Sequence, residues 1–273
     1  MKTISVNVVQ LPRLLPDSWV AQRSLAIVID VLRFTSTACQ ALHVGARSIA
    51  VENEIEQARA LAHRIGDAAL LCGERHCQRI DGFDLGNSPH EYSADKVSGR
   101  DLVFSTTNGT RAVLAVSTSA YLALGCFLNR QAVADWATAL VNRAQVDRID
   151  IICAGTDGQI AAEDVLAAGA IVSSLQFAHV EPKLALNDSS IIALSWWNSL
   201  TQQIQLNEST NGTATSSAKL SATLVTAFSR SLGGANLIKS GFASDLTHTA
   251  QIDQVKTVPI LVTDKWPRFV ALA

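Results

Sequence analysis

The chain has 273 residues, of which 48% are hydrophobic and 17% charged, and its formal net charge is −2. This composition excludes a disordered chain, and the absence of a Lys/Arg cluster argues against a nucleic-acid-binding protein. No apolar run reaches the roughly 18 residues that a membrane helix requires, so we expect no membrane span.

The five cysteines are an odd number, which argues against a disulfide framework and favours a reducing, cytoplasmic setting. Cys39, Cys126 and Cys153 lie in apolar segments and are expected to be small core residues. The N-terminal segment lacks the long apolar stretch of a signal peptide, which is consistent with the same setting. The sequence does not determine the oligomeric state, and a homodimer is the possibility considered.

Strands and helices alternate along the chain. Residues 4–9 predict a first strand, and the continuous apolar run 25–29 is typical of a strand buried on both faces. A helix of small and apolar residues follows, up to about residue 44. Further strands are expected at 47–51, 69–72, 101–105, 121–124, 149–153 and 258–262, and further helices at 53–65, 110–116, 128–143, 160–177, 187–205 and 218–232.

This alternation predicts an α/β fold, layered α/β/α, with a largely parallel or mixed sheet. We interpret residues 1–273 as a single catalytic α/β unit, and two lobes, 1–125 and 126–273, with the site between them are the alternative. The polar stretch from Asn207 to Ser217 is expected to be an exposed loop. Pro259 suggests that the last strand lies at a sheet edge.

Two polar runs stand out from this pattern. Residues 81–89, Asp-Gly-Phe-Asp-Leu-Gly-Asn-Ser-Pro, are too rich in turn-forming residues to lie inside a helix or strand. Residues 106–110, Thr-Thr-Asn-Gly-Thr, separate an apolar strand from a helical segment. That geometry directs free N–H groups toward an anion. Ordinary surface connections are the alternative for both runs.

The strand–loop–helix pattern occurs at residues 30–37, 106–110 and 154–164. Loops after parallel strands meet at one edge of a sheet, so their polar residues should converge. A divalent cation would relieve the repulsion among several carboxylates, and oxygen ligands suit Mg²⁺. The residues expected to converge are Asp30, Arg33, Asn108, Thr110, Asp157, Glu163 and Asp164.

Each candidate also has a purely structural interpretation. Asp30 could cap the next helix, and Glu163 and Asp164 could complement a helix dipole. Arg33 could be a surface salt-bridge partner, and Glu74-Arg75 could be solvated loop charges. The six histidines show no metal-ligand spacing, and Walker-A, G-x-G-x-x-G and C-x₅-R signatures are absent. The residues alone thus indicate a Mg²⁺-dependent enzyme acting on a small polyanion.

At these motifs the chain resembles the 2-phosphosulfolactate phosphatase family. The resemblance covers nearly the whole chain and is most specific in the two polar runs. The matching segments are Ile29–Arg33 with Thr35 and Thr37, Gly73–Arg75, Gly82–Pro89, Thr106–Thr110, Cys153–Thr156, Glu163–Leu166, Ala168–Ala170, Gly241, Asp245-Leu246, Asp253 and Val258-Pro259.

The resemblance implies a Mg²⁺-dependent acid phosphatase that releases phosphate from 2-phospho-3-sulfolactate, a step of coenzyme M biosynthesis in methanogens, with relatives in bacteria. It also implies a small phosphorylated and sulfonated acid as the binding partner. The residues carried over to matching positions are Asp30, Arg33, Glu74, Asn87, Asn108, Thr110, Glu163 and Asp164.

Our mechanistic hypothesis distributes roles among these residues. Asp30, Glu163 and Asp164 hold Mg²⁺, and Arg33 with the Asn108 loop stabilises the phosphoryl oxygens. Glu74 or Asp157 transfers the proton. Two other hypotheses stay open: a Mg²⁺-dependent hydrolase or phosphotransferase for another small polyanion, and a non-catalytic anion-binding protein.

Overall fold

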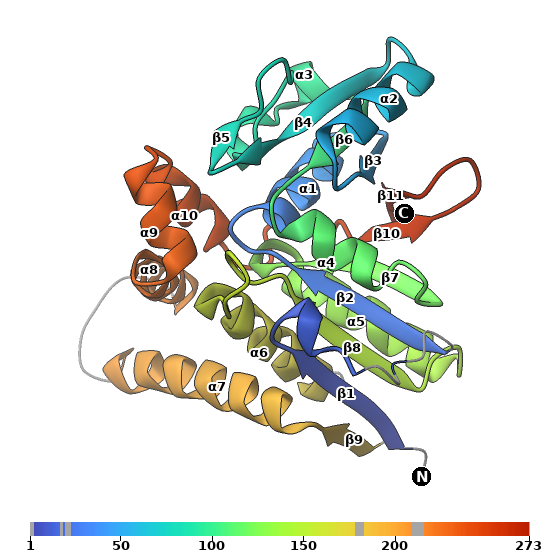
Figure 1. The fold of residues 1–273 in the computed structure, drawn as a ribbon. Helices are drawn as coiled ribbons and strands as arrows, with labels where there is room; N and C mark the ends of the chain where they lie inside the picture. Colours follow the sequence, from blue (N-terminus) through green and yellow to red (C-terminus); the bar gives the residue numbers. More distant parts are fainter. Residues whose placement is uncertain (1–2, 17–18, 20–22, 178–182, 209–215, 273) are drawn as a thin grey trace.

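The computed structural model describes residues 3–16, 19, 23–177, 183–208 and 216–272 (Figure 1). Its strands form one mixed 11-stranded sheet in the order β5-β4-β6-β3-β11-β10-β7-β2-β8-β1-β9. They are β1 (Thr3–Val9), β2 (Ser24–Ile29), β3 (Ser48–Val51), β4 (Ala69–Arg75), β5 (Gln78–Arg79), β6 (Asp101–Ser105), β7 (Tyr121–Gly125), β8 (Arg148–Cys153), β9 (Lys183–Leu186), β10 (Pro259–Val262) and β11 (Arg268–Ala271).

The sheet contains two parallel sets of strands. Strands β7, β2, β8, β1 and β9 are parallel to one another, as are β3, β6 and β4. The β10–β11 hairpin joins the sets, because β10 pairs antiparallel with β7 and β11 pairs antiparallel with β3. The two sets therefore have opposite directions within the sheet.

Sheet twist nevertheless brings the carboxyl ends of both sets to one side of the molecule. Neighbouring strands rotate by roughly 20–25° relative to each other, and several strands separate β2 from β4. Both strands end on the side occupied by the C-terminal helices (Figure 1). There Arg33, after β2, bonds to Asp245, and Gln78, after β4, bonds to Ser240.

Helices cover both faces of the sheet, as the predicted α/β/α layering requires. Leu25, Ile27 and Ile29 of β2 pack in one hydrophobic cluster, whereas Ala26 and Val28 pack in another. The helices are α1 (Phe34–His43), α2 (Ile55–Ile65), α3 (Ala94–Val97), α4 (Gly109–Ala115), α5 (Arg130–Asn142), α6 (Ala162–Phe177), α7 (Asp188–Glu208), α8 (Ser216–Ser229), α9 (Leu232–Lys239) and α10 (Ala243–Thr249), with short 3₁₀ helices η1 (Pro12–Leu14), η2 (Pro89–Glu91) and η3 (Phe127–Asn129).

The α/β fold class and the burial of β2 on both faces are confirmed. The prediction of an edge strand at Pro259 is wrong, because β10 lies between β7 and β11. Proline is tolerated there as the first residue of its strand. No strand was expected after residue 262, yet β11 pairs with β10 on the side opposite β7 and itself pairs with β3. The division into lobes at residue 125 stays a prediction.

The polar stretch from Asn207 to Ser217 is only partly a loop. Its first two residues end α7 and its last two begin α8, while residues 209–215 lie outside the described part of the chain. No described helix combines the length and hydropathy needed to cross a membrane. Cys39, Cys126 and Cys153 are buried, as expected for core residues. The cytoplasmic setting and the homodimer stay predictions.

Close packing of α6 against α7 provides a test of this fold. A Cβ atom at Gly169 would overlap the carbonyl oxygen of Ala193. We expect Gly169→Ala to lower the free energy of unfolding by about 1–3 kcal/mol because α7 must move outward, although alanine favours a helix intrinsically. Urea denaturation measures the change. Ala222→Ser, at an exposed position of α8, is the control and should stay within about 0.5 kcal/mol of the parent protein.

Candidate active site

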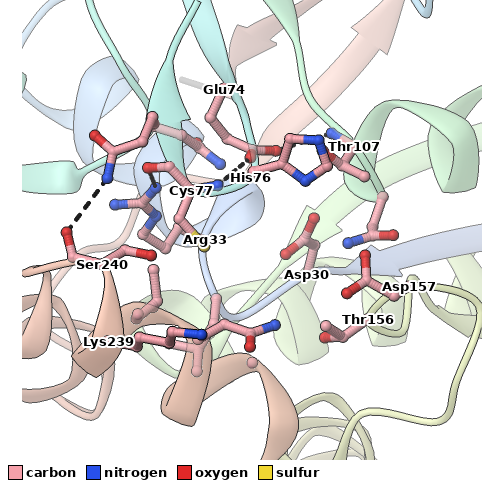
Figure 2. Close-up of a pocket in the computed structure, with 17 residues that line it drawn as sticks. Asp30, Arg33, Glu74, His76, Cys77, Thr107, Thr156, Asp157, Lys239 and Ser240 are labelled. Atoms are coloured by element: carbon pink, nitrogen blue, oxygen red, sulfur yellow. Dashed lines mark hydrogen bonds between the residues drawn. The ribbon is translucent and has the colours of Figure 1, made fainter.

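A cavity of about 540 Å³ lies between the carboxyl ends of β2, β4, β6 and β8 and helix α9. Figure 2 shows Asp30 in the middle of the lining residues, with His76 and Thr107 on one side and Thr156 and Asp157 on the other. The structure brings together six of the predicted site residues in the cavity lining: Asp30, Arg33, Glu74, Asn87, Asn108 and Asp157.

Asp30 follows β2 directly and is only 6% exposed. The Thr35 hydroxyl accepts a hydrogen bond from the Asp30 N–H (3.1 Å) and donates one to its carbonyl (2.9 Å), which fixes the loop. Burial, followed by the charge of Glu74, raises the pKa of Asp30 to about 7. Helix α4 closes on this carboxylate, since a Cβ atom at Gly109 would lie 2.5 Å from Asp30 Oδ2. Asp30 is therefore a carboxyl group that can exchange a proton near neutral pH.

Asp164 joins two of the loops beside the cavity. Its Oδ1 accepts the N–H of Val31 (2.9 Å), after β2, and its Oδ2 accepts the N–H of Gly155 (3.0 Å), after β8. Burial, followed by the charges of Glu163 and Asp30, raises the pKa of Asp164. With one backbone bond at each oxygen, Asp164 acts primarily as a brace between the loops.

Glu74 also accepts two backbone N–H groups, from two other loops of the cavity. Its Oε1 accepts the N–H of Thr107 (2.9 Å), after β6, and its Oε2 accepts the N–H of Cys77 (2.9 Å), in the turn between β4 and β5 (Figure 2). His76 and Cys77, the two central residues of this turn, have positive φ angles of 52° and 65°. Non-glycine residues adopt such angles only when their surroundings hold them there, and the Glu74 carboxylate contributes to that hold.

Arg33 belongs to a buried ion pair. Its Nη1 donates to Asp245 Oδ2 (2.8 Å), and both side chains are at most 2% exposed. Its Nη2 donates to the Cys77 carbonyl (2.8 Å), and the guanidinium lies 4.4 Å from the centre of the Phe242 ring. Arg33 lines the cavity, and these two hydrogen bonds use two of its five N–H donors, so its orientation is set by Asp245 and Cys77.

Two buried polar atoms of the cavity lining lack a hydrogen-bond partner within the described residues: Asn87 Oδ1 and Thr107 Oγ1. Asn87 is held through its main chain, whose carbonyl accepts the Thr37 hydroxyl (2.8 Å). Glu91 accepts the flanking N–H groups of Gly86 (2.8 Å) and Ser88 (3.4 Å). Because unpartnered buried polar groups are costly, these atoms are suitable contacts for a bound ligand.

Three predicted site residues lie outside the cavity lining. Thr110 is fully buried and donates to the Thr106 carbonyl (2.7 Å), so it stabilises the loop. Asp164 braces the loops, and Glu163 lies beneath Gly233 of α9, where a Cβ atom would be 2.5 Å from Glu163 Oε1. Burial raises the pKa of Glu163, and its Oε2 lacks a partner within the described residues.

The three proposed metal ligands do not form a complete ligand set. Within the described residues, no group of three or more His, Cys, Asp or Glu side chains is placed to hold a metal ion. Asp30 faces the cavity, whereas Glu163 and Asp164 lie behind it. The assignment of these residues to Mg²⁺ stays a prediction.

Sequence analysis missed the α9 wall of the cavity. Asn236, Lys239 and Ser240 line it, yet no motif singled them out. The helix predicted at 218–232 ends instead at Ser229, and Gly233 and Gly234 lie in the first turn of α9, whose N-cap Ser231 accepts the Gly234 N–H (3.1 Å). His76 also lines the cavity, although the spacing of the histidines in the sequence does not indicate a site.

Comparisons with known proteins agree with one another. A model of the 2-phosphosulpholactate phosphatase family matches residues 9–264. The chain is 36% identical to a protein of Pseudothermotoga lettingae (90% of this chain, 93% of that protein) and 38% identical to one of Deinococcus radiodurans (91% of each). A protein of Caldanaerobacter subterraneus subsp. tengcongensis is 44% identical over 55% of this chain, an alignment that covers only 61% of that protein's length. All three are named "Probable 2-phosphosulfolactate phosphatase".

The raised pKa of Asp30 predicts a pH-dependent effect on stability. Its pKa of about 7 lies above the ordinary value of 3.8, so the folded state holds this proton more tightly than the unfolded state. The resulting destabilisation is absent below pH 3.8, grows as the pH rises to 7 and persists above it. At pH 8 in EDTA we expect Asp30→Asn to raise the free energy of unfolding by roughly 1–3 kcal/mol. At pH 4 the difference should vanish, and an equal gain at both pH values would contradict the assignment.

The buried Arg33–Asp245 ion pair predicts a large loss of stability when the Asp245 side chain is truncated. Asp245→Ala leaves a buried guanidinium without its partner, and we expect the free energy of unfolding to fall by about 3–5 kcal/mol. The exposed pair Arg23–Asp147, whose side chains are 54% and 42% exposed, supplies the control. Asp147→Ala should cost less than about 1 kcal/mol in the same urea titration. Comparable losses for both variants would show that burial of the Arg33 pair is not decisive.

Proposed function

The chain belongs to the 2-phosphosulfolactate phosphatase family, a family of phosphoric monoester hydrolases, and we propose that it hydrolyses the phosphate ester of 2-phosphosulfolactate or of a closely similar small phosphorylated acid. The products are the hydroxy acid, sulfolactate, and inorganic phosphate.

The observation that carries this proposal is the position of Asp30. It is a buried carboxyl group with a pKa near neutrality, in a cavity whose lining includes the unpartnered polar atoms of Asn87 and Thr107. A volume of about 540 Å³ accommodates a small phosphorylated acid with surrounding water. A titrating group beside unused polar contacts is typical of a catalytic site.

The carboxylates of the cavity fit a Mg²⁺ ion that takes only one or two ligands from the protein. Mg²⁺ commonly binds through one or two carboxylates and keeps waters and substrate phosphate as its other ligands. Both Glu74 carboxylate oxygens accept backbone N–H groups, whereas the Asp30 carboxylate has one backbone hydrogen bond, from Phe34, and Asp157 is exposed at the cavity. In our proposal Asp30 holds the ion, with Asp157 as the second candidate. When bound, Mg²⁺ would neutralise charge on the phosphoryl oxygens.

The remaining steps follow from side chains of the cavity. Hydrolysis adds one water: its oxygen bonds to phosphorus and the ester P–O bond breaks. One proton of the water passes to the leaving oxygen and the other stays on the phosphate. Asp157 is exposed at the cavity and is our candidate for this proton transfer. The Thr107 hydroxyl and the side-chain N–H groups of Asn87 and Asn108 orient the phosphate by donating hydrogen bonds to its oxygens.

Two residues take different roles from those that the sequence suggested. Glu74 was a candidate for proton transfer, but its bonds to the N–H groups of Thr107 and Cys77 make it a positioning residue. Arg33 was expected to grip the phosphate, but its ion pair with Asp245 makes it primarily an anchor that also contributes positive charge to the cavity.

Phosphate release from purified protein tests the proposal. We expect turnover of 2-phosphosulfolactate with Mg²⁺, loss of turnover in EDTA and recovery after Mg²⁺ is added back. Asp30→Asn should lower kcat by a factor on the order of 10²–10³ because it removes charge from the reacting end of the site. Its far-UV circular dichroism should match that of the parent protein.

A panel of phosphorylated hydroxy acids separates the competing hypotheses. Faster turnover of another member would favour a hydrolase for a different small polyanion. Tight binding of these acids with no phosphate release at any pH or metal concentration would favour a non-catalytic anion-binding protein. Full activity of Asp30→Asn would refute the role of Asp30 whichever substrate is best.

A further inference from the structure

The two walls of the cavity differ in charge. The wall built from the strand ends carries the carboxyl groups of Asp30, Glu74 and Asp157. The α9 wall carries the amide of Asn236 and the ammonium group of Lys239. Figure 2 shows Lys239 across the cavity from Glu74. An anion that cannot approach the acidic wall would therefore be attracted to the α9 wall.

Lys239 is the cavity cation that is available for a ligand. The other lining side chain with a permanent positive charge, Arg33, is paired with Asp245. Lys239 is exposed and has no hydrogen bond or ion pair with any described residue. Its position in the last turn of α9 also complements the helix dipole, but a lysine pointing in any direction from that turn would do so. The orientation toward the cavity calls for a further reason.

The backbone beneath Lys239 is fixed at both ends of α9. At the N-terminus, Gly233 packs so closely on Glu163 that a Cβ atom would lie 2.5 Å from Glu163 Oε1. At the C-terminus, the Ser240 carbonyl accepts a hydrogen bond from Gln78 Nε2 (3.3 Å). Because α9 is tied to the hairpin that follows β4, Lys239 starts from a defined position at the rim of the cavity.

We propose that Lys239, assisted by the Asn236 amide, binds the sulfonate group of the substrate while its phosphate lies against the wall that contains Asp30. This inference rests on the proposed function and adds the group that selects a sulfonated acid. Phosphate and sulfonate are both anionic and repel each other, so separate cationic partners favour binding of both. A lysine ammonium is a compact charge with three donors, and it matches any of the three sulfonate oxygens without a bidentate geometry.

A pair of substrates that differ only in the sulfonate tests Lys239. For 2-phosphosulfolactate we expect Lys239→Ala to lower kcat/KM on the order of 10- to 100-fold, mainly through KM, because a charge-assisted bond to the bound substrate is lost. For 2-phospholactate, which lacks the sulfonate, the change should stay within about threefold. Lys239→Arg should retain most of the parent preference because it keeps the charge.

Lys256→Ala is the matched control, since Lys256 is exposed and borders a separate groove, and it should leave both substrates unaffected. Equal losses on both substrates, or no loss on the sulfonated one, would overturn the assignment of Lys239. If the parent protein released phosphate from neither substrate, the proposed function would fail on its own. Calorimetric measurement of sulfolactate binding would then still test the role of Lys239. Lys239→Ala should weaken this binding at least tenfold, and unchanged binding would refute the inference.

Discussion

Carboxylates that each accept two backbone N–H groups hold the site together. Asp164 joins the loops after β2 and β8, and Glu74 joins the loop after β6 to the turn after β4. Glu91 makes the corresponding pair of bonds within the loop that contains Asn87. Each carboxyl oxygen accepts one N–H group from a loop, and loops lack the regular hydrogen-bond partners of helices and strands. These braces therefore determine where the side chains that contact a ligand can lie.

The nearby carboxyl groups also contribute to the raised pKa of Asp30. Burial is the larger cause of its raised pKa, and Glu74 and Glu163 add to it. The ion pair of Arg33 with Asp245 partly offsets this charge and connects α10 to the loop after β2. The C-terminal helices thus close the cavity and also balance its charge. Opposite strand directions in the two parallel sets do not prevent this, because twist across the sheet carries both sets of carboxyl ends to the α9 side (Figure 1).

Local patterns were sufficient to predict the strand ends but not the roles of the acids. The apolar run of β2 and the Thr-Thr-Asn-Gly-Thr loop placed Asp30 and Asn108 correctly at one cavity. Nothing in the spacing distinguished Glu74 and Asp164, which brace loops, from Asp30, which faces the cavity, because the difference depends on which amides arrive from distant segments. Gly73 illustrates the same limit: its φ of 141° and its close approach to the Ser105 carbonyl give the Gly-Glu-Arg motif a structural purpose. Helix α9 could not be assigned to the site for the same reason, since its position depends on contacts with Glu163 and Gln78.

Charge balance also constrains how an anionic substrate can enter. A phosphate approaching Asp30 and Asp157 meets like charges unless Asp30 is protonated or a cation is present. With a pKa of about 7, Asp30 is largely neutral in the metal-free protein under mildly acidic conditions and ionised above neutrality. Metal binding requires the ionised form, so the proposed Mg²⁺ competes with the proton for the same carboxylate. The acidic wall is then compatible with a phosphate in either state, but only the ionised state with its cation can also stabilise the charge that develops during hydrolysis.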